Sequence, residues 1–173
     1  MKQYFLLVLS AAVIITLVFC GGEKAAKQTD TAADVPVAAE QPSAEGTAYD
    51  CQYFSLTLAE GWEASPLNMG MVNVLPKGKT SPGLYFKFEG NGNAAGTAEA
   101  SIESMIKNYG GSPMESTTIA GVEFKTTTYA YSGMTQTMHV AFRDGTKITI
   151  TIEGAGAKDN PDIQAMLASL KLK

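Results

Sequence analysis

Hydrophobic and polar positions divide the chain into three parts. An apolar run over residues 4–19 follows a short positively charged start, and this order is typical of a secretory signal. Residues 21–48 contain no aromatic side chain, and their only large aliphatic residues are two valines, so this segment cannot bury enough apolar surface to fold. The pattern therefore predicts a signal peptide at 1–20, a disordered linker at 21–48 and a folded domain at 49–173.

Within the predicted domain, apolar and polar residues alternate in short runs, as they do in strands that bury one face. Two further segments carry apolar residues at helical spacing. The first helix begins after the N-cap Thr97, and the second begins after Asn160, where Pro161 suits the first helical position. The element order βββ-α-ββββ-α predicts an α+β fold, with an antiparallel sheet of about six to seven strands and two helices packed on it. The predicted strands are 53–58, 71–75, 84–88, 114–119, 122–130, 134–142 and 146–153.

The register of the last three strands follows from the turns at Gly133 and Gly145. Each glycine suits the last position of a three-residue hairpin loop. Such loops set Phe142 opposite Thr146 and gather the aliphatic side chains on one inner face, which both helices would cover. A two-residue loop would set Phe142 opposite Lys147 and split the aliphatic residues between the two faces. We therefore expect three-residue loops.

With this register, the outer face of the sheet is predicted to be solvent-exposed and rich in threonine. That face is either simply solvated or a surface on which an envelope protein docks. On the inner face, Thr126, Thr128 and Gln136 interrupt the apolar pattern near the turn at Ser132, and we expect a shallow polar cleft there. The candidate partner surface consists of Thr127, Tyr129, Gln136, Thr137 and His139.

Charge and chemistry narrow the class of function. The chain has 13 Lys and Arg against 17 Asp and Glu, a balance that argues against nucleic acid as a partner. His139 is the only histidine, and its predicted neighbours Lys125 and Thr149 supply neither a carboxylate nor a nucleophile, so no catalytic triad or histidine-based zinc site is expected. We expect no catalytic residue, no metal and no cofactor. A thiol-dependent or other hydrolytic enzyme that uses Cys51 is the alternative.

The end of the apolar run, Leu17-Val18-Phe19-Cys20, is followed by two glycines. This ending resembles the lipobox of bacterial lipoproteins, in which a cysteine is acylated and becomes the first residue after cleavage. The resemblance implies that Cys20 carries fatty-acyl chains such as palmitate and anchors the protein to a membrane of the cell envelope, on the periplasmic or outer-surface side. An uncleaved anchor helix is the alternative, although a run of 16 residues falls at or below the ~17–25 needed to span a bilayer.

The domain resembles the PsbP-like and DcrB-like superfamily of small exported domains. The resemblance rests on the element order, on the first strand running into Leu58-x-x-Gly61-Trp62, and on the hairpin signal Ile119-Ala120-Gly121-Val122. It implies a non-enzymatic, accessory role. The hypothesis is therefore a lipid-anchored envelope protein whose domain binds a protein or a small ligand without catalysis. A purely structural lipoprotein is a further alternative.

Overall fold

A computed structural model of the chain describes residues 46–90 and 96–173. The predicted signal peptide, the lipidation candidate Cys20 and nearly all of the predicted linker lie outside the described residues. The first strand, β1, begins at Thr47, two residues before the predicted start of the domain at Tyr49. Neither helix of the described residues has the length and apolar character that crossing a membrane requires.

The predicted α+β class is confirmed, because antiparallel strands form the bulk of the domain and two helices pack on them. Every predicted strand and both predicted helices are present, and three strands and a short 3-10 helix are additional. The additional elements are β1 (Thr47–Asp50), β3 (Trp62–Leu67), η1 (Ala157–Asp159) and β10 (Lys171–Leu172). The predicted elements are β2 (Phe54–Leu58), β4 (Met71–Pro76), β5 (Gly83–Glu89), α1 (Ala98–Tyr109), β6 (Glu115–Ile119), β7 (Val122–Tyr131), β8 (Met134–Arg143), β9 (Thr146–Glu153) and α2 (Pro161–Ser169).

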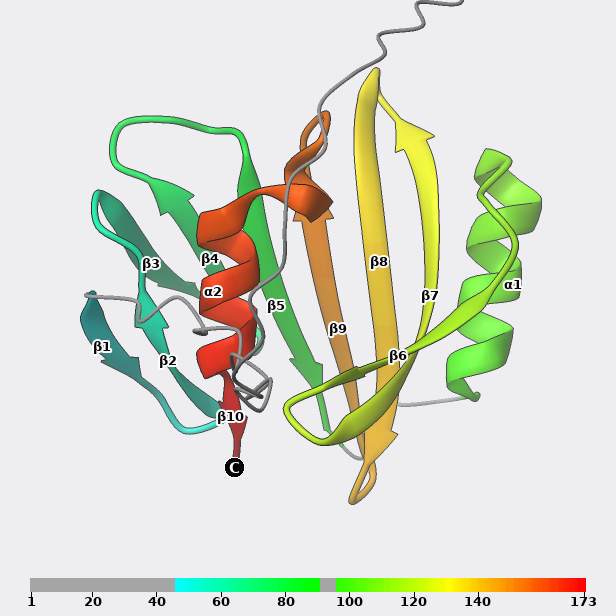
Figure 1. The fold of residues 1–173 in the computed structure, drawn as a ribbon. Coiled ribbons are helices and arrows are strands. Elements are labelled where there is room, and N and C mark those ends of the chain that lie inside the picture. Colours follow the sequence, from blue (N-terminus) through cyan, green and yellow to red (C-terminus); the bar gives the residue numbers. More distant parts are fainter. Residues whose placement is uncertain (1–45, 91–95) are drawn as a thin grey trace, which may run out of the picture. The chain divides into compact units, whose positions relative to one another are not determined.

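The strands form two sheets (Figure 1). The larger sheet has seven strands in the order β3-β4-β5-β9-β8-β7-β6, and the smaller sheet has the order β1-β2-β10. All neighbouring strands are antiparallel. At the middle of the larger sheet, β5 pairs with β9 over seven residues. This pairing joins the first half of the domain to the second half.

The predicted register of β8 is wrong by one residue. Tyr131 pairs with Met134, and Arg143 pairs with Thr146, so both hairpins have two-residue loops. The central residues of each loop have positive φ, 51° and 80° in one and 50° and 74° in the other, as type I′ turns require. Phe142 consequently lies opposite Lys147. Relative to the prediction, β8 alone is turned over, because β7 and β9 keep their predicted alignment with each other.

The prediction failed because the larger sheet is covered on both faces. One face carries α2 and the smaller sheet, and together they form the main core. Phe54 of β2 stacks on Phe86 of β5 with ring centroids 4.4 Å apart, and both rings are almost completely buried. Burial of side chains of this size stabilises the fold by about 1.5–3 kcal/mol each. The indole nitrogen of Trp62 also donates a hydrogen bond of 3.0 Å to Asp162 in the first turn of α2.

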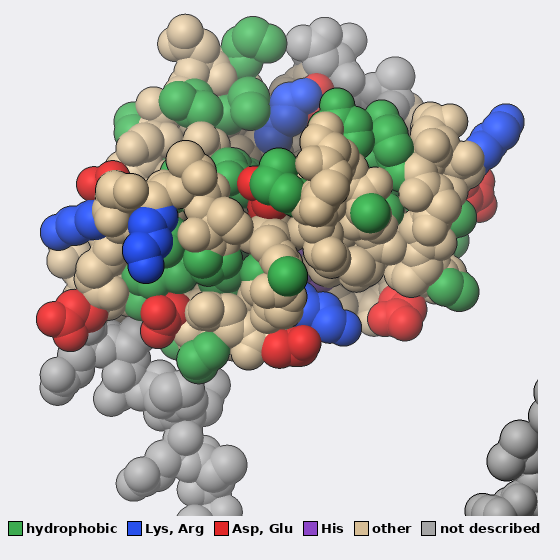
Figure 2. Space-filling model, turned by 90° about the horizontal axis from the view of Figure 1, so that it is seen from above, with side chains coloured by type: hydrophobic (Ala, Val, Ile, Leu, Met, Phe, Trp, Pro, Cys, Tyr) green, Lys and Arg blue, Asp and Glu red, His purple; other side chains and the backbone are tan. Residues whose placement is uncertain are grey.

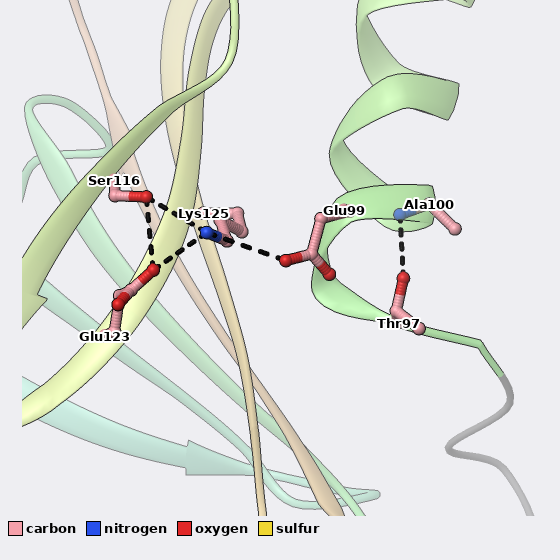
Figure 3. A network of polar contacts seen from close by, with 6 residues as sticks. All are labelled: Thr97, Glu99, Ala100, Ser116, Glu123 and Lys125. Carbon is pink, nitrogen blue, oxygen red and sulfur yellow. Dashed lines mark hydrogen bonds and ion pairs between the residues drawn. The ribbon is translucent and has the colours of Figure 1, made fainter.

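Helix α1 covers the opposite face, where it contacts β7 and β8. The expectation that both helices share one face is therefore wrong. The Thr97 hydroxyl caps α1 by accepting a hydrogen bond from the backbone of Ala100 at 3.1 Å. Lys125 of β7 lies 3.6 Å from Glu99 of α1 and 2.8 Å from Glu123 (Figure 3). Ile102 is the buried apolar residue of α1. The face of the sheet that α1 covers therefore also requires apolar side chains, and β8 supplies some of them.

A pair of substitutions at Asp144 tests the two-residue loop. Asp144 has a φ of 50°, so Asp144→Ala should lower the free energy of unfolding by about 1 kcal/mol because a Cβ without a local hydrogen bond is strained in this region. Asp144→Gly removes the same contact with Arg143, but glycine adopts a positive φ without strain. This variant should therefore leave the free energy of unfolding nearly unchanged or raise it. Urea denaturation measures both. Greater stability of Asp144→Ala than of Asp144→Gly would favour the three-residue loop, in which residue 144 has a negative φ that alanine adopts without strain.

Candidate functional site

Side-chain polarity divides the face of the larger sheet that α2 covers. Over β4, β5 and β9 this face is apolar, and α2 and the smaller sheet close it. Over β7 and β8 the same face carries paired polar residues, because Thr126 lies opposite His139 and Thr128 lies opposite Thr137. The covering elements do not fill the space above these residues. A cavity of about 460 Å³ remains there.

The cavity is bounded by β6 on one side and by η1 and α2 on the other, and β7, β8 and β9 contribute its floor. Hydroxyl groups and one imidazole predominate on the side of the sheet, whereas α2 contributes mainly apolar groups. The expected polar cleft is therefore present, although Gln136 is not part of it. The lining residues are Glu115, Thr117, Thr118, Ile119, Ala120, Thr126, Thr128, Thr137, His139, Ile152, Lys158, Gln164, Leu167 and Ala168.

His139 is the most distinctive residue of the cavity. Only 8% of its surface is exposed, and its Nδ1 atom is 2.8 Å from the hydroxyl oxygen of Thr126. Its Nε2 atom is buried and has no hydrogen-bond partner among the described residues. Burial lowers the pKa of His139 to about 4 because the charged imidazolium is poorly solvated there. The imidazole is therefore neutral near physiological pH and can act as either a donor or an acceptor at Nε2, depending on its tautomer.

The other polar groups of the cavity are neutral or exposed. The hydroxyl oxygens of Thr128 and Thr137 are 3.0 Å apart, and each retains capacity for a further hydrogen bond. Glu115 and Lys158 line the cavity as exposed residues of opposite charge. Figure 2 shows that acidic and basic side chains are also interspersed over the whole face in view, without a patch of one sign.

This arrangement is suited to binding. A catalytic histidine normally has a carboxylate that orients it and a nucleophile within hydrogen-bond reach, whereas Thr126 occupies the position beside Nδ1 of His139. Among residues 46–90 and 96–173, no group of three or more His, Cys, Asp or Glu side chains is placed to hold a metal ion. The cavity does offer several neutral hydrogen-bonding groups at fixed positions. Such groups orient a ligand inside a concave site.

The five residues of the predicted partner surface do not lie on one face. Thr137 and His139 line the cavity, whereas Thr127, Tyr129 and Gln136 lie on the face that α1 covers. Thr127 is buried and donates a hydrogen bond of 2.8 Å to the carbonyl of Ser112. The one-residue change in the register of β8 causes this arrangement, since it places Thr137 and His139 on the face with the cavity and moves Gln136 from the predicted inner face to the face that α1 covers.

Tyr129 and Gln136 instead belong to a chain of hydrogen bonds at the end of the face that α1 covers. The Tyr129 hydroxyl donates to the side-chain oxygen of Gln136 at 2.8 Å, and the Gln136 amide donates to Glu153 at 2.6 Å. The ring of Tyr129 stacks on Tyr109 of α1 with centroids 5.6 Å apart. Burial raises the pKa of Tyr129 to about 12. These contacts give both residues a structural role between α1 and the sheet.

Cys51, the residue of the alternative thiol enzyme, lies between β1 and β2. It is partly buried against the main core, and it does not line the cavity that contains His139. The sequence did not identify Glu115, Gln164 or Lys158 as site residues. Each comes from a different element. These elements meet only when β6 joins the sheet and α2 and η1 pack on it.

Solved structures show the same fold in other proteins. The solution structure of cyanobacterial PsbP (CyanoP) from Synechocystis sp. PCC 6803 aligns with a TM-score of 0.51 at 12% identity, over 73% of this chain and 92% of that one. A crystal structure from Bacteroides thetaiotaomicron aligns with a TM-score of 0.52 at 12% identity over 74% of this chain, which spans only 48% of that protein. LpqN from Mycobacterium tuberculosis, described as involved in cell envelope biogenesis, aligns with a TM-score of 0.44 at 11% identity, over 75% of this chain and 86% of that one.

No protein-family model and no curated protein matches the sequence. At 12% identity the likeness to CyanoP and to the Bacteroides protein concerns the fold alone. The domain therefore has a PsbP-like fold.

The buried imidazole predicts a specific loss of stability in acid. Both the folded and the unfolded chain hold His139 neutral above the ordinary pKa of about 6.5, and between that value and about 4 only the unfolded chain takes up the proton. Lowering the pH from about 7 to about 4.5 should therefore reduce the free energy of unfolding by roughly 2 to 3 kcal/mol through this residue.

Urea denaturation of the wild type and of His139→Asn at both pH values measures this effect, and the variant should lose the His139 contribution. An NMR titration of the His139 ring provides an independent measurement. A ring that titrates near its ordinary pKa of about 6.5 would contradict the buried, neutral imidazole.

Proposed function

We propose that the protein is a lipid-anchored protein of the cell envelope whose domain binds a ligand or partner segment without catalysis, in the cavity at His139. The observation that carries the proposal is the cavity that contains His139, Thr126, Thr128 and Thr137, in which the buried Nε2 atom of His139 has no hydrogen-bond partner among the described residues. A buried polar atom without a hydrogen bond costs about 1–3 kcal/mol. Because Nε2 is buried in this structure, an occupant recovers this free energy only if the imidazole turns toward the cavity.

The chemistry of the cavity limits the occupant. The low pKa of His139 keeps the imidazole neutral, and the threonine hydroxyls are neutral as well, so the floor supplies no charge to balance a buried ion. Burial of an unpaired charge is strongly unfavourable. An uncharged group with hydrogen-bond donors and acceptors therefore fits best. The apolar wall formed by Ile152 and Leu167 is suited to its hydrocarbon part.

The anchoring part of the proposal rests on the sequence. The apolar run at 4–19 and the lipobox-like ending at Cys20 favour export and acylation, and a double acyl chain is sufficient for stable attachment to a membrane. A linker of the composition found at 21–48 has a root-mean-square reach of roughly 30 Å if it behaves as a flexible coil. The anchored domain then meets its partners near a membrane, which raises their effective concentration.

Metabolic labelling tests the anchor. Cells that express the wild-type chain in the presence of a radioactive or alkyne-tagged fatty acid should incorporate the label, because Cys20 carries the acyl chains. Cys20→Ser should abolish the incorporation. Equal labelling of the two proteins would show that another residue or no residue is acylated.

Photo-crosslinking in intact cells tests the binding site. A photoreactive amino acid at Ala168, an exposed cavity residue of α2, should capture a specific occupant. The same group at Glu103, exposed on α1, is the control and should not capture it. His139→Asn keeps a polar atom near the position of Nδ1 and should reduce the capture at Ala168, whereas His139→Gln keeps one near Nε2 and should retain more of it.

The crosslinked products are read by mass spectrometry. Identical adducts from Ala168 and Glu103, or no adduct from Ala168, would be incompatible with a binding site in this cavity. Capture that does not respond to either substitution of His139 would remove the imidazole from the site.

A further inference from the structure

We propose that the occupant of the cavity is an extended peptide that pairs with the free edge of β6 as an additional strand and places an uncharged polar side chain near His139. The inference rests on the proposed binding function and specifies the class of partner. Three observations carry it: β6 has an unpaired edge, this edge carries little protection, and the cavity lies along it.

The first observation is the position of β6 in the larger sheet. In the described part of the chain, β6 pairs only with β7. The hairpin between them has the two-residue loop Ala120-Gly121 with φ values of 51° and 75°, so Ile119 and Val122 form the hydrogen-bonded pair that closes a type I′ turn. Hydrogen-bonded and non-hydrogen-bonded pairs alternate in an antiparallel ladder. The backbone N–H and C=O groups of Ser116 and Thr118 therefore point away from β7.

The second observation is that β6 has few of the features that usually protect an edge strand, since its only charged residue is Glu115 at the first position. Proteins block such edges with proline, with lysine or by making the strand very short. Of the other edge strands in the two sheets, β10 has two residues and β1 has four, and β3 contains Pro66. The segment Glu115–Ile119 contains no proline and no basic residue. No proline or lysine of β6 therefore hinders the approach of another strand.

The third observation is the place of the cavity beside this edge. Thr117, Thr118 and Ile119 line it. The side chains of Thr117 and Thr118 point to opposite faces of the sheet, because successive side chains of a strand alternate. The cavity thus extends to the outer margin of β6. A strand that pairs there runs about 4.8 Å from β6 and directs every second side chain to the face that carries His139. The space of about 460 Å³ is sufficient for such a side chain.

Backbone pairing and the cavity have separate roles in this mode of recognition. Main-chain hydrogen bonds supply affinity for any extended peptide, and pockets for alternate side chains supply selectivity. Unpaired N–H and C=O groups at Ser116 and Thr118 match a peptide backbone better than they match a compact small molecule. The neutral His139 and the threonine hydroxyls then select a side chain such as that of Asn, Gln, Ser or Thr.

The test uses the full chain in detergent micelles and a randomised heptapeptide library displayed on phage. The tightest peptide is synthesised, and hydrogen exchange of the protein is followed by NMR with and without it. The amides of Ser116 and Thr118 should gain at least about tenfold protection, as expected when backbone hydrogen bonds form. N-methylation of single peptide amides should abolish binding at every second position and be tolerated between them.

A matched pair of variants addresses the same contact from the side of the protein. Thr118→Pro removes one outward N–H group and should weaken binding of the peptide by about tenfold or more. Thr118→Val retains the N–H group and should weaken binding much less than Thr118→Pro does. The N-methyl series keeps the test decisive if Thr118→Pro does not fold.

Three results would overturn the inference: no peptide is enriched, the two amides gain no protection, or N-methylation has no alternating effect. Peptide binding that depends on His139 but not on the amide of Thr118 would also overturn strand addition, while it would support the binding site in the cavity. Failure of the crosslink from Ala168 in cells is a different result, because it would remove the proposed function itself.

Discussion

The pairing of β5 with β9 is the interaction on which the rest of the structure depends. Leu84, Phe86 and Phe88 of β5 lie opposite three isoleucines of β9, and all six side chains are buried. This central row joins the strands before α1 to the strands after it. Because its apolar side chains face α2 and the smaller sheet, it also determines where the main core is. The remaining strands extend from this row towards two edges that differ in character.

Coverage of both faces of the larger sheet explains the arrangement of β8. Under α1, the sheet needs apolar residues, and Val140 of β8 is buried there beside Ile102 of α1. On the opposite face, Ala141 joins the main core. A strand buried on both faces carries apolar residues at successive positions, so it lacks the alternation that would fix its register. The two type I′ turns determine the register instead, and they place His139 in the cavity.

The cavity exists because the main core ends before the sheet does. Helix α2 and the smaller sheet close over the strands whose side chains are apolar. Towards β6, the same face becomes polar at Thr126 and Thr128, and the covering layer separates from it. An unpaired strand edge and a row of neutral hydrogen-bonding groups therefore lie together. Their proximity is the structural basis for both the binding function and the class of partner proposed above.

The α+β class, the boundaries of most strands and both helices could be predicted from the sequence, because alternation, helical spacing and caps such as Thr97 and Asn160 are local signals. The sequence also indicated the polar cleft through Thr126 and Thr128, which interrupt an apolar face. It did not reveal β1, β3 and β10, which are short or mostly exposed and form only because neighbouring strands pair with them.

The tertiary structure alone decided which face each side chain of β8 occupies, and hence that His139 lines a cavity while Tyr129 supports α1. It also decided that Glu115, Gln164 and Lys158 share this site with His139. The physical reason is the same in both cases. These positions depend on how layers distant in sequence pack on the two faces of the sheet, and a pattern read along a single strand reports only that some face is buried.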